Sequence, residues 1–444
     1  MIFGSMLSVS QMVTLYNTSV IPAAVYVLGN LYPQERRTTT LKKCRDLDGD
    51  VRKLFISYNM KGRTSARVST YIPSSRGGLG LKSIEHEVEV MYVRKAAYLQ
   101  SHQDLEKTRE RYNRLIAAGW RNPMGDANHV LGKYQVNMRG RRVDEPVRDY
   151  CRSLAREIEH QQLTWLMNEW KGCKYARVVD ENANIMACPA FTSPYMERWM
   201  FSLILNAAEE QVAGLGTYTG KKCRMGCEVV ETAYHVVSAC LGPEYTTRHD
   251  NAVCWFIKHI LYAMKAPKFL SDHIHLSRSS LVAEFMWGER VVKIRAEVRI
   301  MTDVKLHHNK PDIMFILSNP DEVIVLELAV SHLQNMRLQE TIKRTRYAKN
   351  SVVPVTGANV DDVGRDYNVA NILREIHRCP VYLGVYVFGA LGEILNTEAH
   401  IKGQAILGKL GLSRRSIDLL MRRCCFAVAK ESTKILMRRL NYRK

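Results

Sequence analysis

Two acidic residues interrupt an apolar segment at residues 307–330, which reads HHNKPDIMFILSNPDEVIVLELAV. Asp312 precedes the first apolar run, Glu327 lies near the end of the second, and the tetrapeptide SNPD between the runs has the residues of a turn. If SNPD is a four-residue loop, Asp312 stands directly opposite Glu327 on one face of a hairpin, with the Cβ atoms about 5 Å apart. A loop one residue longer would place the acids on opposite faces.

This acid pair predicts a bound cation. Like charges that face each other destabilise a sheet unless one of them is protonated or a cation lies between them. The flanking runs are apolar on both faces, as in a sheet covered by helices on both sides, so the carboxylates are not explained by contact with water. A hard divalent cation such as Mg²⁺ or Mn²⁺ binds through oxygen ligands and would remove the conflict.

The helix expected after the second run adds a base. In QNMRLQETIKRTRYAKN, Met336, Glu340, Lys343 and Tyr347 recur at helical spacing, and Arg346 neighbours this stripe. A helix in this place can lay the stripe over the two acids. Acids, a lysine and a metal suit the hydrolysis of a phosphodiester, because the metal polarises the phosphate and activates water while the lysine offsets developing charge. Each residue taken singly also has a structural explanation, as a strand cap, an ion pair or a solvated lysine.

A second cluster of metal-binding residue types lies in CRMGCEVVETAYHVVSAC. Cys223, Cys227, His235 and Cys240 form a C-x3-C-x7-H-x4-C array. Three thiolates and one imidazole suit a closed tetrahedral zinc site, which predicts a structural zinc ion that folds a small knuckle. The alternative is three buried cysteines that stand near a histidine by chance.

Bulk composition points to a polyanionic partner. The net charge is +20 over 444 residues, 46% of them hydrophobic, which favours nucleic acid over a membrane surface. No run of 18 apolar residues and no signal segment is recognised, so an intracellular protein without a membrane partner is expected. The remaining cysteines are scattered, which indicates a reducing compartment.

Periodicity divides the chain into an α-helical N-terminal part, the small zinc knuckle, and an α/β domain. The expected regions are 1–100 and 101–222, both helical, 223–265 for the knuckle and the following helix, 281–410 for the α/β domain, and 411–444 for a basic C-terminal helix. That last helix could grip phosphates or could expose a solvated basic face, because residues 413–444 hold ten Lys or Arg against two acids.

Several motifs in this order resemble the C-terminal part of the polyprotein of a non-LTR retrotransposon that carries a restriction-like endonuclease. LYNTSVIPAAVYVLGNLYP, LDGDVRKLFI and SSRGGLGLKSIE resemble the reverse transcriptase thumb; LGKYQ and ILNAAEEQVAGLGTY resemble the linker. The cysteine array followed by EYTTRHD resembles the family's CCHC knuckle and Arg-His motif. HNKPDI, VLELAV, KRTRY and VFGALGEI resemble an endonuclease of the PD-(D/E)xK class, which implies a restriction-endonuclease-like fold.

The resemblance implies roles residue by residue. Asp312 and Glu327 would be catalytic acids that bind Mg²⁺ or Mn²⁺, although the second acid is more often Asp in these elements. Lys343 and Tyr347 would be catalytic. The four residues of the cysteine array would bind zinc. Residues implied to contact nucleic acid are Arg248, His249 and Arg346. The implied activity is nicking of a DNA target in the nucleus, where the freed 3′-hydroxyl primes reverse transcription of the element's RNA.

One departure concerns polymerisation. The aromatic-Ala-Asp-Asp turn of a polymerase palm does not occur, and the single Asp-Asp pair, Asp361–Asp362, lies in ANVDDVG, after the endonuclease motifs. We therefore expect a partial copy that begins at about the thumb and does not polymerise DNA. The alternative to a nuclease is a non-catalytic remnant that still binds RNA or DNA.

Overall fold

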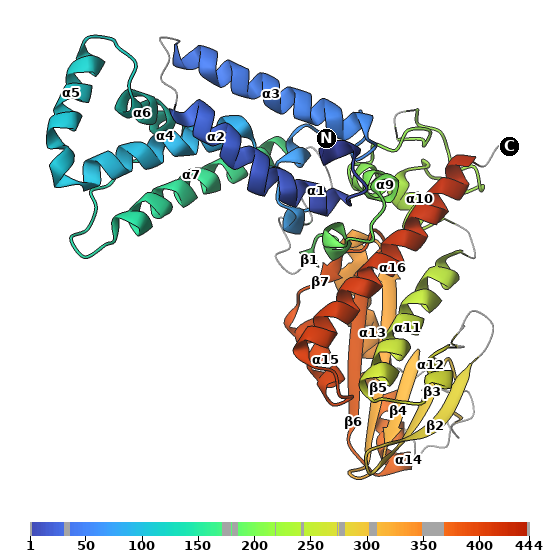
Figure 1. Cartoon of the computed structure of the whole chain (residues 1–444). Coiled ribbons are helices and arrows are strands. Elements are labelled where there is room, and N and C mark those ends of the chain that lie inside the picture. The colour runs from blue at the N-terminus through green and yellow to red at the C-terminus, as the bar shows by residue number, and fades with distance from the viewer. Residues whose placement is uncertain are drawn as a thin grey trace. The chain divides into compact units, whose positions relative to one another are not determined.

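A computed structural model of the chain shows two compact units (Figure 1). The helical unit comprises Met1–Ala176 and Pro194–Leu205, and the α/β unit comprises Arg177–Ser193 and Asn206–Lys444. The structure describes residues 2–30, 36–170, 179, 185–217, 219–240, 244–272, 274, 280–301, 309–348 and 368–441. The expected boundaries after residues 100, 222 and 410 therefore lie inside these units, and Asp361–Asp362 lies outside the described residues.

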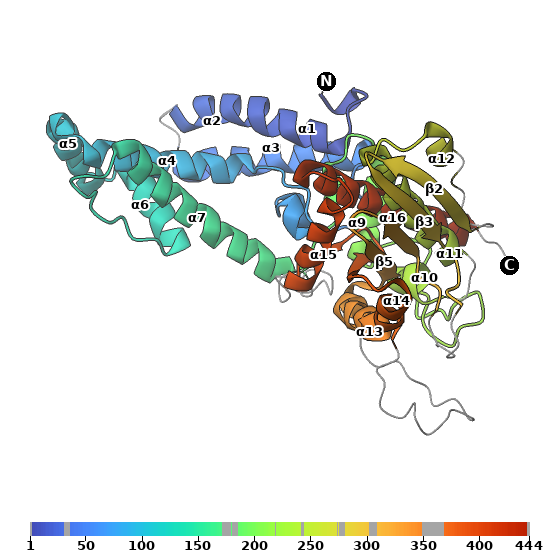
Figure 2. The ribbon, with the colours of Figure 1, turned by 90° about the horizontal axis from the view of Figure 1, so that it is seen from below.

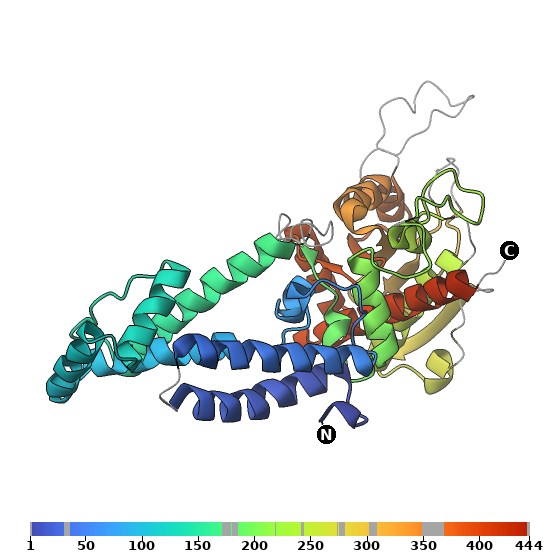
Figure 3. The same ribbon diagram turned by 90° about the horizontal axis from the view of Figure 1, so that it is seen from above.

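The helical unit is built around α4. Its described helices are α1 (Val9–Leu15), α2 (Ile21–Asn30), α3 (Arg37–Ser57), α4 (Ile84–Ser101), α5 (Glu106–Ala117), α6 (Pro123–Tyr134), α7 (Val147–Trp170) and the start of α9 (Arg198–Ala208). Helix α4 packs against α2, α3, α6 and α7, and its Val88, Tyr92, Val93 and Ala96 are fully buried. Helix α7, drawn in green, is the longest described helix of the unit (Figure 3).

Pro22 follows a π-helical turn, Tyr16–Val20, which joins α1 to α2. Proline has no N–H to donate, and the wider turn lets the helix pass without that bond. The combined stretch Val9–Asn30 has a mean hydropathy of 1.3, and a third of its most apolar window is buried. By length and composition it could cross a membrane, and a core helix passes the same test, so the expected absence of a membrane partner stays a prediction.

The segment SSRGGLGLKSIE forms a short 3-10 helix, Ser74–Arg76, and then the start of α4. The chain doubles back closely here, because Gly80 N–H donates to the Ile72 carbonyl oxygen at 2.8 Å. Gly78 lies so near this strand of backbone that a Cβ atom would stand 2.1 Å from Ile72 O. Only a residue without a side chain fits at Gly78.

We predict that Gly78→Ala lowers the free energy of unfolding by roughly 1–3 kcal/mol, because the added methyl group overlaps a backbone oxygen that a rotamer change cannot move. Thermal unfolding of the full chain measures this loss. Gly140→Ala is the matched control, since an added Cβ there meets no atom within 4 Å. Equal melting temperatures for the two variants would contradict the prediction.

The described strands of the α/β unit form one seven-stranded mixed sheet in the order β1-β7-β6-β5-β4-β3-β2. Strands β5 and β6 are parallel, and the other paired strands are antiparallel. The strands are β1 (Ile185–Met186), β2 (Leu281–Trp287), β3 (Arg290–Ala296), β4 (Ile313–Leu317), β5 (Glu322–Ser331), β6 (Val381–Gly389) and β7 (Ile394–Leu395). The helices are α10 (Ala233–Ser238), α11 (Glu244–Ala263), α12 (Lys268–Asp272), α13 (Met336–Ala348), α14 (Val369–His377), α15 (Glu398–Gly408) and α16 (Arg414–Asn441).

Helices cover both faces of the central strands, as the apolar runs predict (Figure 2). Ile313, Phe315, Ile324 and Leu326 face a core that is completed by α11, α15 and α16. The alternate residues face a smaller core that is completed by α13 and α14. The structure is therefore compatible with the expected order, a helical N-terminal part followed by an α/β part.

The basic C-terminal helix is not an appendage. Helix α16 buries Ile417, Leu420, Cys424 and Val428 in the larger core and packs along α11. Its exposed cations occupy the opposite side. Both alternatives considered from the sequence concerned this exposed side, while the buried apolar side fixes the helix in the unit.

Candidate active site and metal centre

The hairpin has the expected register. Leu317 pairs with Glu322 across the loop of residues 318–321, so the four-residue turn is confirmed. At the other end, Asp312 N–H donates to Glu327 Oε1 at 3.0 Å, and Leu328 N–H donates to Asp312 Oδ2 at 2.6 Å. Asp312 is 7% exposed and Glu327 is fully buried. The two acids are thus held side by side, each by the backbone of the opposite strand.

Helix α13 brings Lys343 to this pair. Its Nζ lies 2.7 Å from Glu327 Oε2 and 3.6 Å from Asp312 Oδ2. Met336, Glu340 and Tyr347 on the same stripe are buried, as the spacing predicts. The cation between the acids in this structure is therefore the Lys343 ammonium.

The two acids differ in pKa because their surroundings differ. Desolvation and the neighbouring charge of Asp312 raise the pKa of Glu327 to about 8. Burial works against the Asp312 charge too, but hydrogen bonding to His249 and the charges of His249 and Lys343 hold its pKa below the ordinary value. Lys343 stays charged because the attraction of both acids outweighs its own burial and raises its pKa. The pair therefore binds one proton readily near neutral pH.

Tyr347 and Arg346 follow on the last turn of α13. The Tyr347 hydroxyl donates to the Lys310 carbonyl oxygen at 3.2 Å, and burial, followed by the nearby acids, raises the pKa of this phenol well above its usual range. Tyr347 is thus a neutral hydrogen-bonding group beside the acids. Arg346 is half-buried.

Sequence reasoning missed a second set of ligand atoms beside Asp312. His249 Nε2 lies 3.4 Å from Asp312 Oδ2, and its Nδ1 lies 3.5 Å from Asp250 Oδ1. One ligand atom each from His249, Asp250 and Glu297 falls within 4.8 Å of the others. Glu297 is also paired with Lys310 at 2.5 Å. No spacing in the sequence predicts this group, because its members come from α11 and from the residue after β3.

His249 was expected to contact nucleic acid, and the structure places it against the acids instead. Burial opposes its charge, but hydrogen bonds to Asp250 and Asp312 raise the pKa of His249 to about 10. The side chain is 25% exposed, so one edge of the imidazole still reaches the surface. A cationic His249 at this edge can attract an anion to the acid site.

Arg248 departs from its expected role. It is 2% exposed, and its guanidinium donates to the Val237 carbonyl oxygen at 2.6 Å and to Ser432 Oγ at 2.9 Å. These bonds join α10, α11 and α16 inside the α/β unit. A buried guanidinium that donates to internal acceptors does not lie on a surface that nucleic acid can reach. Arg248 therefore stabilises the packing of these helices.

The cysteine array converges as the spacing predicts. The ligand atoms of Cys223, Cys227, His235 and Cys240 all lie within 4.8 Å of one another and could hold a metal such as zinc. Cys240 Sγ lies 3.5 Å from Cys223 Sγ and 4.0 Å from Cys227 Sγ. Tetrahedral zinc would separate its sulfur ligands by about 3.8 Å. His235 Nε2 is buried without a hydrogen-bond partner among the described residues, so a free ligand atom is in place.

Arg439 of α16 completes this centre, and sequence reasoning missed it. Its guanidinium donates to Cys223 Sγ at 3.3 Å, to Cys240 Sγ at 3.0 Å and to Glu231 at 2.8 Å. Burial works against the Cys223 thiolate, but the Met225 N–H, His235 and Arg439 lower the pKa of that thiol to about 6. Three thiolates around a divalent ion leave one net negative charge, which the guanidinium balances.

No protein-family model matches the chain, and no curated protein matches it. The two sites are therefore interpreted from their own geometry and chemistry.

We predict that Cys227→Ser reduces the zinc that copurifies with the full chain to well below one ion per molecule, because one of four ligands is lost. Metal analysis of the dialysed protein measures this content. Cys151→Ser, which removes a free thiol of the helical unit, should leave it unchanged. Equal zinc in the Cys227 variant and the wild type would refute the assignment.

The raised pKa of Glu327 predicts a pH dependence of stability in metal-free protein. In the unfolded chain this group ionises near its ordinary value of 4.5, whereas the folded protein keeps the proton up to about 8. The resulting stability is fully present below the unfolded value and is lost as the pH rises through about 8.

Glu327→Gln cannot ionise. Its melting temperature minus that of the wild type, both in chelator, should therefore rise between about pH 5 and about pH 8.5. Glu398→Gln, at an exposed pair with Lys402, is the control and should show no such rise. A difference for Glu327→Gln that is constant across this pH range would mean that the residue is ionised throughout.

Proposed function

We propose that the α/β unit is a metal-dependent nuclease that nicks DNA. The observation that carries this proposal is the convergence of Asp312, Glu327 and Lys343, with one ammonium within 3.6 Å of both buried acids. Burying ionisable groups is costly, and a site that gathers two buried acids with a lysine and a histidine is typical of catalytic centres. The net charge of +20 supports a polyanionic substrate.

Asp312 and Glu327 would hold Mg²⁺ or Mn²⁺. The donor set fits such an ion, because both groups offer carboxylate oxygens and their positions are fixed by backbone bonds at 3.0 and 2.6 Å. A bound ion supplies Lewis-acid polarisation of the phosphate and a lowered pKa of water. Binding requires Glu327 to lose its proton, so affinity for the ion should increase with pH up to about 8.

Lys343 and His249 would act on the substrate directly or through the acids. With a metal held by the two acids, Lys343 would no longer be their main counter-charge. Its ammonium would be able to donate to a phosphate oxygen as negative charge develops there. His249, partly exposed, would attract the scissile phosphate, and Tyr347 would orient Lys310 and the adjoining chain through its 3.2 Å bond.

The zinc centre would be structural in this proposal. Four protein ligands leave no open position for chemistry, and Arg439 ties the centre to the helix that spans the α/β core. In a retrotransposon protein of the kind that the sequence resembles, the nick would prime reverse transcription of the element RNA in the nucleus, with the restriction-like fold in the α/β unit.

A supercoiled-plasmid assay tests the proposal. We expect the full chain to convert supercoiled DNA to the open circle with Mg²⁺ or Mn²⁺ and to stop in excess chelator. Asp312→Asn and Lys343→Met should each slow nicking by at least about 100-fold, because each removes a charge that acts on the reacting phosphate.

The matched controls are Asp321→Asn, in the turn at the far end of the hairpin, and Lys402→Met, on α15, whose exposed ammonium pairs with Glu398. Both should nick at the wild-type rate. Equal nicking by wild type and Asp312→Asn would exclude the assigned site. Tight, salt-sensitive DNA binding without any cleavage would favour the alternative, a non-catalytic nucleic-acid-binding remnant.

A further inference from the structure

The helical unit contains a cavity of about 410 Å³ between α4, α6, α7 and the short 3-10 helix Val68–Thr70. We call it the Trp165 pocket. Its lining includes an indole, two amides and two cations, from Trp165, Gln161, Gln162, Arg67 and Lys133. A cavity of this size accommodates a small planar ligand.

The inner wall of the pocket presents a hydrogen-bond acceptor. The Tyr134 hydroxyl donates its proton to Glu89 Oε2 at 2.8 Å, so its oxygen must accept from His86 Nδ1, 3.1 Å away. His86 therefore holds its single proton on Nδ1, and Nε2 carries a lone pair. Burial, followed by the charges of Lys133 and Lys82, lowers the pKa of His86 to about 3, which keeps the ring neutral.

This acceptor is unused. His86 is 5% exposed, and its Nε2 has no hydrogen-bond partner among the residues that the structure describes. A buried polar atom without a partner costs free energy, which a ligand that donates an N–H would recover. His86 belongs to the lining of the Trp165 pocket, so the pocket is the side from which a ligand could approach this ring.

The outer lining suits an aromatic anion. Trp165 is 54% exposed, and an exposed indole is a stacking surface. Arg67 is exposed and forms no ion pair within the described part of the chain. Lys133 is engaged by Glu89 at 2.6 Å, and the one acid in the lining, Glu85, is engaged by Arg45 at 2.7 Å. The uncompensated charge at the mouth is therefore that of Arg67.

We propose that the Trp165 pocket binds one unstacked base of a single-stranded nucleic acid. Trp165 stacks on the base, His86 Nε2 accepts from an N–H on its edge, the amides of Gln161 and Gln162 complete the edge contacts, and Arg67 neutralises the adjoining phosphate. Every base has a π face and an N–H on its edge, so the pocket tolerates different bases.

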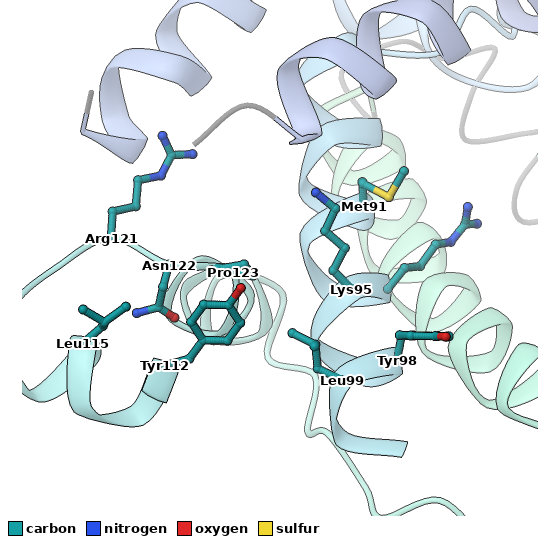
Figure 4. A pocket seen from close by; sticks show the side chains of 10 residues that line it. Met91, Lys95, Tyr98, Leu99, Tyr112, Leu115, Arg121, Asn122 and Pro123 are labelled. Atoms are coloured by element: carbon teal, nitrogen blue, oxygen red, sulfur yellow. The ribbon is translucent and has the colours of Figure 1, made fainter. Parts of the chain in front are cut away.

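A larger cavity of the same unit, about 520 Å³, is lined by residues of α4, α5 and the α5–α6 connection (Figure 4). It also has aromatic and cationic side chains, among them Tyr98 and Arg94, but none of its described lining residues has a buried polar side-chain atom without a partner, as His86 has. Leu99, Leu115 and Met91 contribute apolar walls. Arg121 forms an ion pair with Asp126 at 2.9 Å, and Lys95 donates to the Gly29 carbonyl oxygen. These two cations already have partners within the protein, so they are less available to bind a phosphate.

Fluorescence anisotropy with labelled 12-nucleotide single strands of RNA and of DNA, at fixed salt and with chelator, tests the proposal on the full chain. Trp165→Ala should weaken binding by about 10-fold, through loss of stacking. Arg67→Gln should weaken binding and lower the dependence on salt by about one phosphate contact. The RNA and DNA arms show which strand the pocket prefers.

Matched controls keep the test specific. Trp120→Ala removes an indole that is 68% exposed and does not line the pocket, and Arg63→Gln removes one exposed charge four residues from Arg67. Both should bind like the wild type, apart from a small general charge effect for Arg63→Gln. If Trp165→Ala and Trp120→Ala lose affinity equally, or neither loses any, the pocket does not hold a base.

Photo-crosslinking with 4-thiouridine oligonucleotides gives a readout that does not depend on variants. Crosslinked peptides should include Trp165, Tyr71 or Tyr134 of the lining. Crosslinks confined to other parts of the chain, or binding of double strands alone, overturn the proposal. The nuclease proposal rests on the α/β unit and is decided by Asp312→Asn in the plasmid assay, so a failure of this pocket and a failure of the nuclease proposal are distinguishable.

Discussion

A lysine ammonium between two buried carboxylates is the interaction on which the α/β unit depends. The hairpin register forces Asp312 and Glu327 together, and their repulsion in a water-poor site must be offset. Lys343 does this from α13, so the helix has to cross this end of β4 and β5. Removing one partner of such a buried group typically lowers the free energy of unfolding by about 3–5 kcal/mol. A buried charged cluster is therefore an unfavourable choice if its role is structural alone.

The same balance explains how the site could alternate between two states. Without a metal, the Lys343 ammonium and one shared proton compensate the acids, because the pKa of Glu327 is raised to about 8. In the proposed function a divalent ion would take the place of that proton, and the Lys343 ammonium would then compensate less of the acids' charge.

Net charge overstates how many cations are available to a polyanion. Arg248 and Arg439 belong to basic segments of the sequence, yet both are buried and donate to internal acceptors. Arg439 donates to the Cys223 and Cys240 sulfur atoms of the cysteine centre, and Arg248 joins three helices. Buried basic residues of a helix bind internal acceptors, and exposed ones stay available to a polyanion. Burial depends on which face of the helix meets the core.

Local sequence predicted a large part of the candidate site. The turn residues of SNPD fixed the loop length, alternation then set the register, and helical spacing put Lys343 on the stripe that meets the acids. These inferences succeed because turns, strands and helices obey short-range rules with periods of two and about 3.6 residues. The cysteine spacing succeeded for the same reason, since four ligands within 18 residues have few ways to surround an ion.

Residues that arrive from distant elements lay beyond those rules. His249 on α11 reaches Asp312, the residue before β4, and Arg439 reaches Cys223 from more than 200 residues away. The unused acceptor of His86 depends on a tertiary contact. Because the Tyr134 hydroxyl donates to Glu89, it accepts from His86 Nδ1, which leaves Nε2 without a proton. The sequence by itself predicted the main element types, an acid register that depended on the length of the turn, and a cysteine–histidine cluster that could hold a metal. The tertiary structure decided which charged groups are compensated and which residues compensate them, because compensation depends on distance and burial rather than on spacing along the chain.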